Sequence, residues 1–493
     1  MCGILLVKSQ TEISLDKHLS AFKILQSRGP DFDRYQYENN IFIGQTVLHI
    51  TGTDEYYNDP PDNFLAYNGE VYNYQELGAY RNDIEFVHDC VENNVTRLND
   101  GWGPWAWAWT DNKTVLYAAD PQGERCLYHY QDSEILIVCS EVAPILEYIN
   151  NIKIDVPYLN KTWTMLNQTP WQGITRVQPG QLYQDGKIIR EIDSIFNWIA
   201  PDRYSNINEA YEEFKSIWNR IISAMIPNCP AALTYSGGLD SSVILNSIPG
   251  LELYSVNNLG KDPIVDCIRD LLTSEEQHKL HELTVDKKQW AESFKELIRR
   301  LRMPAQTWSF VGQWIATKNC QQRVLFTGVG ADELFGGYEI YKNIRYADCS
   351  RSPYSRYCDR KLWDRCLSVY DGHPGQATLL IDYIHQVVGC DAQGIDAISG
   401  AWGIETRNPF LTRPIMQFAL NLNHHFKVST ISKPLIRRLF LERWPEQLAF
   451  KKIGFTGHAN DSLPWLNLDI NVTNDRYKDW KQIAQQSFYD SNY

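Results

Sequence analysis

The sequence lacks long apolar runs and is short of positive charge. No stretch approaches the roughly 20 apolar residues that a membrane-spanning helix needs, and the N-terminus has no basic segment followed by a long apolar one. We therefore expect a cytoplasmic protein with no membrane partner. The 493 residues include 60 Asp and Glu against 47 Lys and Arg, which gives a net charge of -13. Because nucleic-acid binding depends on clustered Lys and Arg, we expect no nucleic-acid partner.

The cysteines also form no recognisable framework. There are 11 of them, scattered along the chain and never spaced as Cys-x-x-Cys. This excludes a disulfide scaffold and the usual zinc-ligand pattern, so most should be packing residues. What the chain does have is a hydrophobic content of 43%. That is enough to build the cores of about two to four domains in a chain of this length.

The strongest motif is a Gly- and Ser-rich turn between a strand pattern and a helix pattern. Its residues are Ser-Gly-Gly-Leu-Asp-Ser-Ser, from Ser236 to Ser242. Two glycines let the backbone approach a ligand, and hydroxyls stand beside the free N–H groups of the helix start. Gly-Lys-Ser/Thr is missing, and Asp240 would repel phosphate unless a hard cation such as Mg²⁺ bridged the two. The turn predicts a magnesium nucleotide held at its pyrophosphate. An ordinary capped Gly-Gly turn explains single residues but not the whole set.

A second Gly-rich turn follows the strand pattern Val324–Phe326. It runs from Thr327 to Tyr338 and places Asp332 and Glu333 at a helix start. Strand patterns that alternate with helices indicate α/β architecture with a parallel sheet. Asp240 and Asp332, brought together from distant segments, would be the carboxylate pair that a cation on pyrophosphate needs. The alternative for Asp332 is a solvated helix cap.

The N-terminal third carries a different chemistry. If Met1 is removed, Cys2 gains a free α-amine that titrates near pH 8 and can act as the base for its own thiol. Alone, Cys2 is a weak signal, and Asn68-Gly69 alone would be a hairpin turn. In the stretch from Trp105 to Trp109, tryptophan alternates with alanine. The alternation predicts a core between two sheets rather than a ligand platform.

Taken together, Cys2, Arg28-Gly29-Pro30-Asp31 and the stretch from Tyr67 to Asn73 resemble the N-terminal-nucleophile glutamine amidotransferases. The resemblance implies that the Asn68 side-chain amide and the Gly69 N–H form an oxyanion hole beside the nucleophile Cys2. It also implies that Glu70 and Asp89 bind the substrate glutamine, with Asp89 receiving its α-ammonium. The alternative for Asp89 is a solvated acid at a helix start.

The two Gly-rich turns and the stretch from Ala401 to Leu411 extend the resemblance to the glutamine-hydrolysing asparagine synthetase family. The combination of Val47-Leu48-His49 with Gly103-Pro104-Trp105 is most similar to the asparagine synthetase domain-containing proteins of that family. The family fold would be an αββα sandwich over residues 1–190, the amidotransferase domain. A parallel sheet of the adenine-nucleotide α-hydrolase type would follow over residues 209–470, the ATP pyrophosphatase domain. Such proteins use ATP and Mg²⁺ to adenylate a carboxylate, here expected to be aspartate, and ammonia from glutamine reaches it through an internal tunnel. The resemblance also allows a homodimer.

The same resemblance assigns residues to the synthetase site. Magnesium would be held by Asp240 and Asp332, and Lys452 would neutralise phosphate charge, although a surface lysine is the alternative reading of Lys452. The ATP contacts would be Thr234, Ser236, Gly237, Gly238, Asp240, Ser241, Ser242, Val256, Thr327 and Gly328.

Two positions depart from the family pattern. Val47 stands where relatives carry an arginine that clamps the glutamine carboxylate, and a valine side chain cannot donate a hydrogen bond. Val329 stands where characterised synthetases carry a glutamate associated with the aspartyl-adenylate step. These departures keep two alternatives open: an amide-forming ligase that acts on another carboxylate, as β-lactam synthetases do, and a non-catalytic binding protein.

Overall fold

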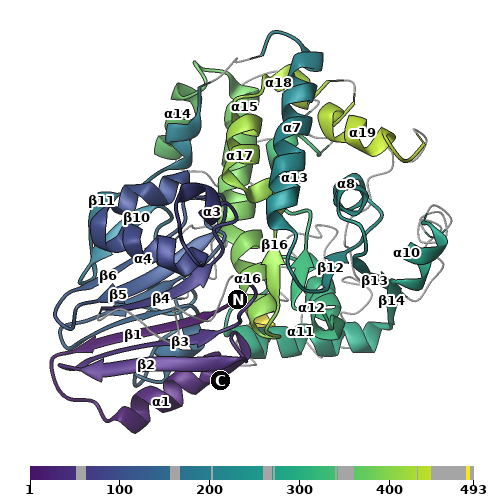
Figure 1. Cartoon of the computed structure of the whole chain (residues 1–493). Helices are drawn as coiled ribbons and strands as arrows, with labels where there is room; N and C mark the ends of the chain where they lie inside the picture. Colours follow the sequence, from purple (N-terminus) through teal and green to yellow (C-terminus); the bar gives the residue numbers. More distant parts are fainter. Residues whose placement is uncertain are drawn as a thin grey trace.

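The structure is a computed structural model, and Figure 1 shows how its elements are arranged. It describes residues 1–51, 63–155, 167–200, 204–258, 269, 272–338, 341, 360–429, 431–445 and 485–488.

The N-terminal part contains two antiparallel sheets that face each other. One has the strand order β2-β3-β1-β8-β7-β9, and the other has the order β11-β10-β6-β5-β4. The strands of the first are β1 (Gly3–Ser9), β2 (Phe32–Glu38), β3 (Ile41–Val47), β7 (Tyr128–Gln131), β8 (Ile135–Cys139) and β9 (Ile174–Arg176). Those of the second are β4 (Phe64–Gly69), β5 (Trp105–Thr110), β6 (Val115–Ala119), β10 (Gln181–Gln184) and β11 (Lys187–Glu191).

Alternation along β1 explains the layering. Ile4 and Leu6 lie in the apolar layer between the sheets. Leu5 and Val7 lie on the outer face of the sheet, where they pack in one cluster with apolar residues of helix α1 (Leu15–Lys23). Because successive strand side chains point to opposite faces, a strand that is apolar at every position is buried on both. Helix α4 (Asp83–Asn93) covers the outer face of the second sheet. The αββα sandwich expected from the sequence is therefore confirmed.

The tryptophans of β5 are core residues, but the layer predicted for them was wrong. Trp105 and Trp107 pack under α4 with Phe86, whereas Ala106 and Ala108 face the other sheet. Small alanines suit the layer where two sheets pack closely, and the bulky rings fill the wider space beneath a helix.

The C-terminal part is built on a five-stranded parallel sheet in the order β14-β13-β12-β15-β16. Its strands are β12 (Ala231–Thr234), β13 (Glu252–Asn258), β14 (Leu280–Val285), β15 (Val324–Phe326) and β16 (Glu405–Arg407). The chain adds β13 and β14 on one side of β12 and then returns to add β15 on the other. This reversal creates a switch point at the carboxyl ends of β12 and β15, where open α/β sheets bind ligands.

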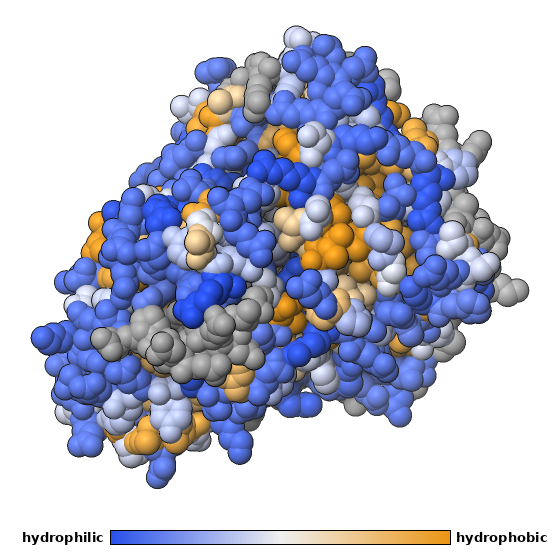
Figure 2. Space-filling model, in the orientation of Figure 1, coloured by the Kyte–Doolittle hydropathy of each residue, from blue (hydrophilic) through white to orange (hydrophobic). Residues whose placement is uncertain are grey.

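Helices surround this sheet and extend above it. Helices α7 (Ile207–Met225) and α17 (Arg413–Leu420) run side by side, and apolar surface gathers between α7 and α8 (Leu239–Ser247) on an otherwise mostly hydrophilic face (Figures 1 and 2). The longer ones beside these are α11 (Lys287–Leu301), α12 (Ser309–Asn319), α14 (Arg360–Ser368), α15 (Pro374–Asp382), a π-helix η7 (Tyr383–Asp391) and α16 (Ala392–Gly400). Short helices are η1 (Ile24–Ser27), α3 (Tyr74–Leu77), η2 (Val95–Asp100), α5 (Val142–Leu146), η3 (Ile195–Trp198), α10 (Ser274–His278), α13 (Ala331–Phe335), η8 (Pro409–Leu411), α18 (His424–Lys427) and α19 (Pro434–Leu441).

Buried ion pairs join the two parts. The Arg28 guanidinium lies 2.9 Å from Asp396 of α16 and 3.4 Å from Glu141, and Arg300 of α11 lies 2.6 Å from the same Glu141. Each of these groups would cost several kcal/mol to bury alone, so the two parts are held in a fixed relation. Among the described residues, no helix is long and apolar enough to cross a membrane.

Candidate active sites

The first Gly-rich turn lies at the carboxyl end of β12. Gly237 has φ +68°, a conformation that favours glycine, and α8 begins at Leu239. The Ser236 hydroxyl accepts a hydrogen bond from the Gly238 N–H at 3.2 Å and lies 3.2 Å from the Ser241 hydroxyl. The turn is thus held open by its own hydroxyls.

The second turn meets the first one closely. A Cβ on Gly328 would lie 2.9 Å from the Cβ of Asp240, so only glycine allows this approach. Thr327 lies beside the turn and donates its N–H to the Arg407 carbonyl at 3.1 Å. The Thr327 hydroxyl donates to the Asn408 side-chain oxygen. The two turns therefore form one site at the switch point of the sheet.

Lys433 joins the two carboxylates of this site. Its Nζ lies 2.7 Å from both Asp240 oxygens and 2.7 Å from Asp332 Oδ1. Burial alone would lower the pKa of Lys433, but the two carboxylates raise it, so the ammonium stays charged. A Cβ on Gly337 would lie 1.8 Å from Asp332 Oδ1, so this glycine makes room for the pair. Sequence reasoning did not assign Lys433 to the site.

Three of the residues predicted for the synthetase site either have side chains in contact with groups outside the two turns or lie outside the described residues. Ser242 is 2% exposed and hydrogen-bonds with Tyr235, whose pKa burial raises to about 12. Val256 packs among apolar residues of the sheet. Lys452 lies outside the described residues. The structure brings together the remaining predicted positions, Thr234, Ser236, Gly237, Gly238, Asp240, Ser241, Thr327, Gly328 and Asp332.

Cys2 lies at the start of β1, beside Asn68 at the end of β4. The Cys2 N–H donates to Asn68 Oδ1 at 2.8 Å, and Arg28 Nε donates to the Cys2 carbonyl at 2.9 Å. The Asn68 Nδ2 is buried and has no hydrogen-bond partner in the described part of the chain. A buried donor without a partner is costly, and this one belongs to the residue that binds the Cys2 N–H. An oxyanion formed at Cys2 would supply the missing acceptor.

Gly69 continues the same strand. A Cβ there would lie 2.4 Å from the Pro104 carbonyl, so the position requires glycine. Burial raises the pKa of the Cys2 thiol and lowers the pKa of the Met1 α-amine. Burial therefore holds the Met1 α-amine towards its neutral form, which is the form that accepts a proton.

A pocket of about 360 Å³ surrounds Cys2. Its walls are formed by Met1, Cys2, Leu48, His49, Ile50, Thr51, Tyr67, Gly69, Glu70, Asp83 and Glu405. Val47 is fully buried and is not among the lining residues. Of the predicted glutamine-binding residues, Glu70 lines the pocket and Asp89 does not.

Asp83, and not Asp89, is the acid of α4 that lines the pocket. Its Oδ2 accepts hydrogen bonds from the Tyr67 hydroxyl at 3.0 Å and the Val71 N–H at 3.1 Å. Asp89 is about one third exposed and pairs with Arg97 at 2.5 Å. The sequence feature that points to Asp83 is Asn82. Its side chain caps α4, so Asp83 lies in the first turn of that helix.

Strand β16 connects the two sites. Glu405, at its first position, lines the Cys2 pocket, whereas the Arg407 carbonyl, at its last, accepts the N–H of Thr327 in the nucleotide turn. Arg407 Nε pairs with Glu405 at 2.8 Å, and its Nη2 lies 3.5 Å from Glu70. Burial, together with Glu405, raises the pKa of Glu70 to about 8.

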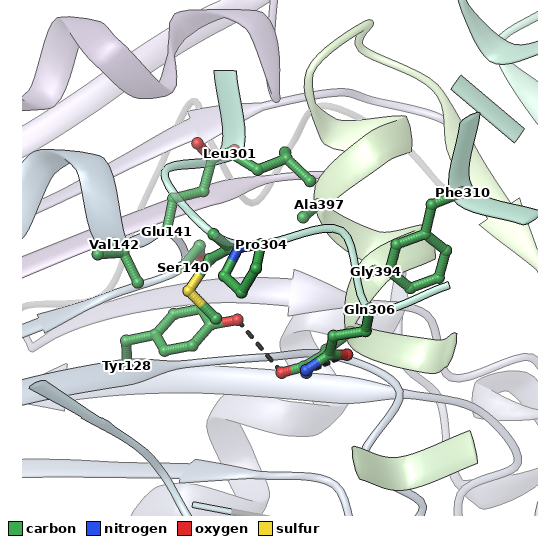
Figure 3. Close-up of a pocket in the computed structure, with 12 residues that line it drawn as sticks. Tyr128, Ser140, Glu141, Val142, Leu301, Pro304, Gln306, Phe310, Gly394 and Ala397 are labelled. Carbon is green, nitrogen blue, oxygen red and sulfur yellow. Dashed lines mark hydrogen bonds between the residues drawn. The ribbon is translucent and has the colours of Figure 1, made fainter. Parts of the chain in front are cut away.

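A separate cavity of about 450 Å³ lies between the two parts (Figure 3). Tyr128 of β7 donates to Gln393 Oε1 at 3.5 Å, and Gln393 donates to Gln306 Oε1 at 3.1 Å. Neither Cys2 nor Asp240 lines this cavity.

Comparisons with known proteins agree with this arrangement. The family described as "Glutamine amidotransferase domain" matches residues 1–191, and that described as "Asparagine synthase" matches residues 222–464. Asparagine synthetase B [glutamine-hydrolyzing] of Escherichia coli (strain K12) is 22% identical over 91% of this chain and 80% of its own. Asparagine synthetase [glutamine-hydrolyzing] of Gallus gallus is 24% identical over 89% and 81%. A solved glutamine phosphoribosylpyrophosphate amidotransferase from B. subtilis covers 47% of this chain and 60% of its own at 15% identity, with a TM-score of 0.30, too low for an argument.

The two family matches follow one another along the chain, one over the N-terminal sandwich and one over the C-terminal parallel sheet, and the curated relatives match across both. The protein therefore belongs to the glutamine-hydrolysing asparagine synthetase family of carbon–nitrogen ligases.

Proposed function

We propose that this protein uses ATP to form an amide on a carboxylate, with ammonia from glutamine hydrolysed at Cys2. The acceptor proposed first is aspartate, through an aspartyl-adenylate. Residues 1–190 would form the amidotransferase domain and residues 209–470 the ATP pyrophosphatase domain. The observation that carries the proposal is the convergence of Asp240, Asp332 and Lys433 where the two Gly-rich turns meet.

At the synthetase site, the acceptor carboxylate would attack the α-phosphorus of ATP, and pyrophosphate would leave. The Ser236–Ser241 turn offers hydroxyls and helix N–H groups to the phosphates. The oxygens of Asp240 and Asp332 already converge on one cation, the Lys433 ammonium, so the pair suits Mg²⁺ bound to pyrophosphate. The metal would neutralise charge on the leaving group, and Lys433 would do the same for the phosphates it then faces.

At the amidotransferase site, the Cys2 thiol would attack the glutamine side-chain amide, with the α-amine of Cys2 accepting the thiol proton after removal of Met1. The buried Asn68 Nδ2 would donate to the oxyanion, as would the Gly69 N–H. Ammonia leaves, and water then hydrolyses the thioester to glutamate.

Strand β16 supports transfer of ammonia within the protein. Its three residues touch the Cys2 pocket at Glu405 and the nucleotide turn at Arg407. Because the two parts are joined by buried ion pairs, the two sites keep a fixed relation during transfer. A second candidate acceptor, a carboxylate other than aspartate, is favoured by Val329, which brings no acidic group to the second turn.

A pyrophosphate-release assay tests the proposal. Aspartate and a set of other carboxylic acids are supplied with ATP and Mg²⁺, first with ammonium and then with glutamine. We expect acid-dependent pyrophosphate release that Asp240→Asn abolishes without unfolding the protein. No release with any acid, from folded protein that binds ATP, would favour a non-catalytic role.

A further inference from the structure

The pocket around Cys2 is walled by acidic side chains. Glu70, Asp83 and Glu405 all line it, and each is at most 7% exposed. No Lys or Arg is among the lining residues that the structure describes. The described lining therefore provides several partners for a ligand ammonium and no Lys or Arg for a ligand carboxylate.

Two guanidinium groups lie close to the pocket, and both are already committed. That of Arg28 binds the Cys2 carbonyl, Glu141 and Asp396, and that of Arg407 lies behind the wall. The Arg407 Nε lies 2.8 Å from Glu405, and its Nη1 donates to the Met225 carbonyl at 2.5 Å. Its Nη2 lies 3.5 Å from both Glu70 Oε2 and Thr51 Oγ1. One arginine already shared between two acidic side chains has no further donor to offer a ligand carboxylate.

The pKa values of the acids show the same imbalance. Burial, together with Glu405, raises the pKa of Glu70 to about 8, and burial raises the pKa of Asp83 to about 6. The raised pKa values show that further negative charge in the pocket is unfavourable even in the absence of a ligand. A bound ammonium would relieve that repulsion, whereas a bound carboxylate would increase it.

We propose that the Cys2 pocket prefers a glutamine whose α-amine is free and whose α-carboxylate is masked as an amide, as in the N-terminal glutamine of a peptide. This inference rests on the proposed role of Cys2 as the nucleophile. The α-ammonium pairs with the acidic wall formed by Glu70 and Asp83. A masked carboxyl keeps a carbonyl oxygen that accepts hydrogen bonds but adds no negative charge. Val47, in the place of an arginine, fits a donor that needs no carboxylate clamp.

The chemistry at the reacting amide is unchanged by the mask. The Cys2 Sγ forms a bond to the side-chain carbonyl carbon, and the C–N bond breaks, so that ammonia leaves with the proton taken from the thiol. Water then attacks the thioester, the C–S bond breaks, and the thiol is regenerated. The products are ammonia and a glutamate that has a free γ-carboxylate and an α-carboxyl still masked as an amide.

The test compares four amides on the full-length protein after mass spectrometry has shown that it begins at Cys2. These are L-glutamine, L-glutamine α-methylamide, the peptide Gln-Gly-Gly-amide and N-acetyl-L-glutamine, with ammonia and the acid product both measured. We expect kcat/KM for the methylamide to exceed that for glutamine by about tenfold or more, the size of one lost charged hydrogen bond. N-acetyl-glutamine, which lacks the amine, should not react. The peptide distinguishes a peptide N-terminus from a small amide as the source of the donor.

One variant sharpens the result: Cys2→Ala should hydrolyse none of the amides. Equal or better use of glutamine by the unmodified protein would overturn the inference and leave the proposed function intact. If His49→Gln then abolished glutamine hydrolysis, the His49 imidazole would be the group that binds the glutamine α-carboxylate. If no amide is hydrolysed while ammonia still supports pyrophosphate release, the amidotransferase half of the proposed function fails, and the inference fails with it.

Discussion

Replacing Lys433 by methionine removes the ammonium that bridges Asp240 and Asp332. Breaking a buried ion pair by removing one partner costs about 3 to 5 kcal/mol. Both carboxylates are about one quarter exposed, at 23% and 25%, and water screens part of their repulsion. We therefore expect a loss of about 3 kcal/mol, the lower end of that range. The loss should shrink when Mg²⁺ is added, because a divalent cation can replace the ammonium.

The assay is urea unfolding of each variant followed by circular dichroism, with and without Mg²⁺. Lys427→Met is the matched control, since Lys427 is also buried but forms no ion pair in the described part of the chain. Burial lowers the pKa of Lys427 to about 7, so its loss should be neutral or stabilising. The triple variant Lys433→Met, Asp240→Asn, Asp332→Asn should regain much of the stability that Lys433→Met lost, because the three groups are coupled. If Lys433→Met unfolds like the unmodified protein, or if the losses simply add, the three-residue contact is wrong.

Three further predictions concern the Cys2 pocket. Asp83→Asn should raise the KM for an amine-bearing amide donor about tenfold, whereas Asp89→Asn should leave it within about twofold; equal effects in a glutaminase assay would contradict the placement of Asp83. The folded protein holds a proton on Glu70, with a pKa of about 8, that the unfolded chain releases above about 4.5, so stability should fall as pH rises through this window. Melting temperatures measured across that window should shift in favour of Glu70→Gln as pH rises, and a constant difference would refute the raised pKa. Cys2→Ala should abolish amide-dependent synthesis and keep ammonia-dependent synthesis, measured as product formed with each nitrogen source, because the two reactions use separate sites; loss of both would refute that separation.

Local patterns in the sequence were sufficient to place both Gly-rich turns. Each turn follows a short apolar strand and opens a helix, and parallel strands that adjoin in a sheet bring such turns to one edge. The sandwich was predictable for a related reason, since the strand patterns and the family resemblance agree. Cys2 lies beside Asn68 because the start of β1 meets the end of β4.

The residues that sequence reasoning missed depend on tertiary structure. Lys433 arrives from 193 positions beyond Asp240, in a left-handed conformation at the start of α19 that no local pattern indicates. Glu405 reaches the Cys2 pocket only because β16 is the edge strand next to the N-terminal part. Asp83 and Asp89 lie on the same helix, and the choice between them depends on how α4 is rotated over the sheet.

In the proposed function, nitrogen released at Cys2 is joined to a carboxylate activated at Asp240 and Asp332. The most direct measurement follows an amide donor labelled with ¹⁵N in its side chain, in the presence of ATP, Mg²⁺ and the preferred acid, with a large excess of unlabelled ammonium in solution. We expect labelled amide product and one pyrophosphate per product, with the label lost in Cys2→Ala and all product lost in Asp240→Asn. Product that carries only unlabelled nitrogen, or label incorporation without pyrophosphate release, would contradict the proposed function.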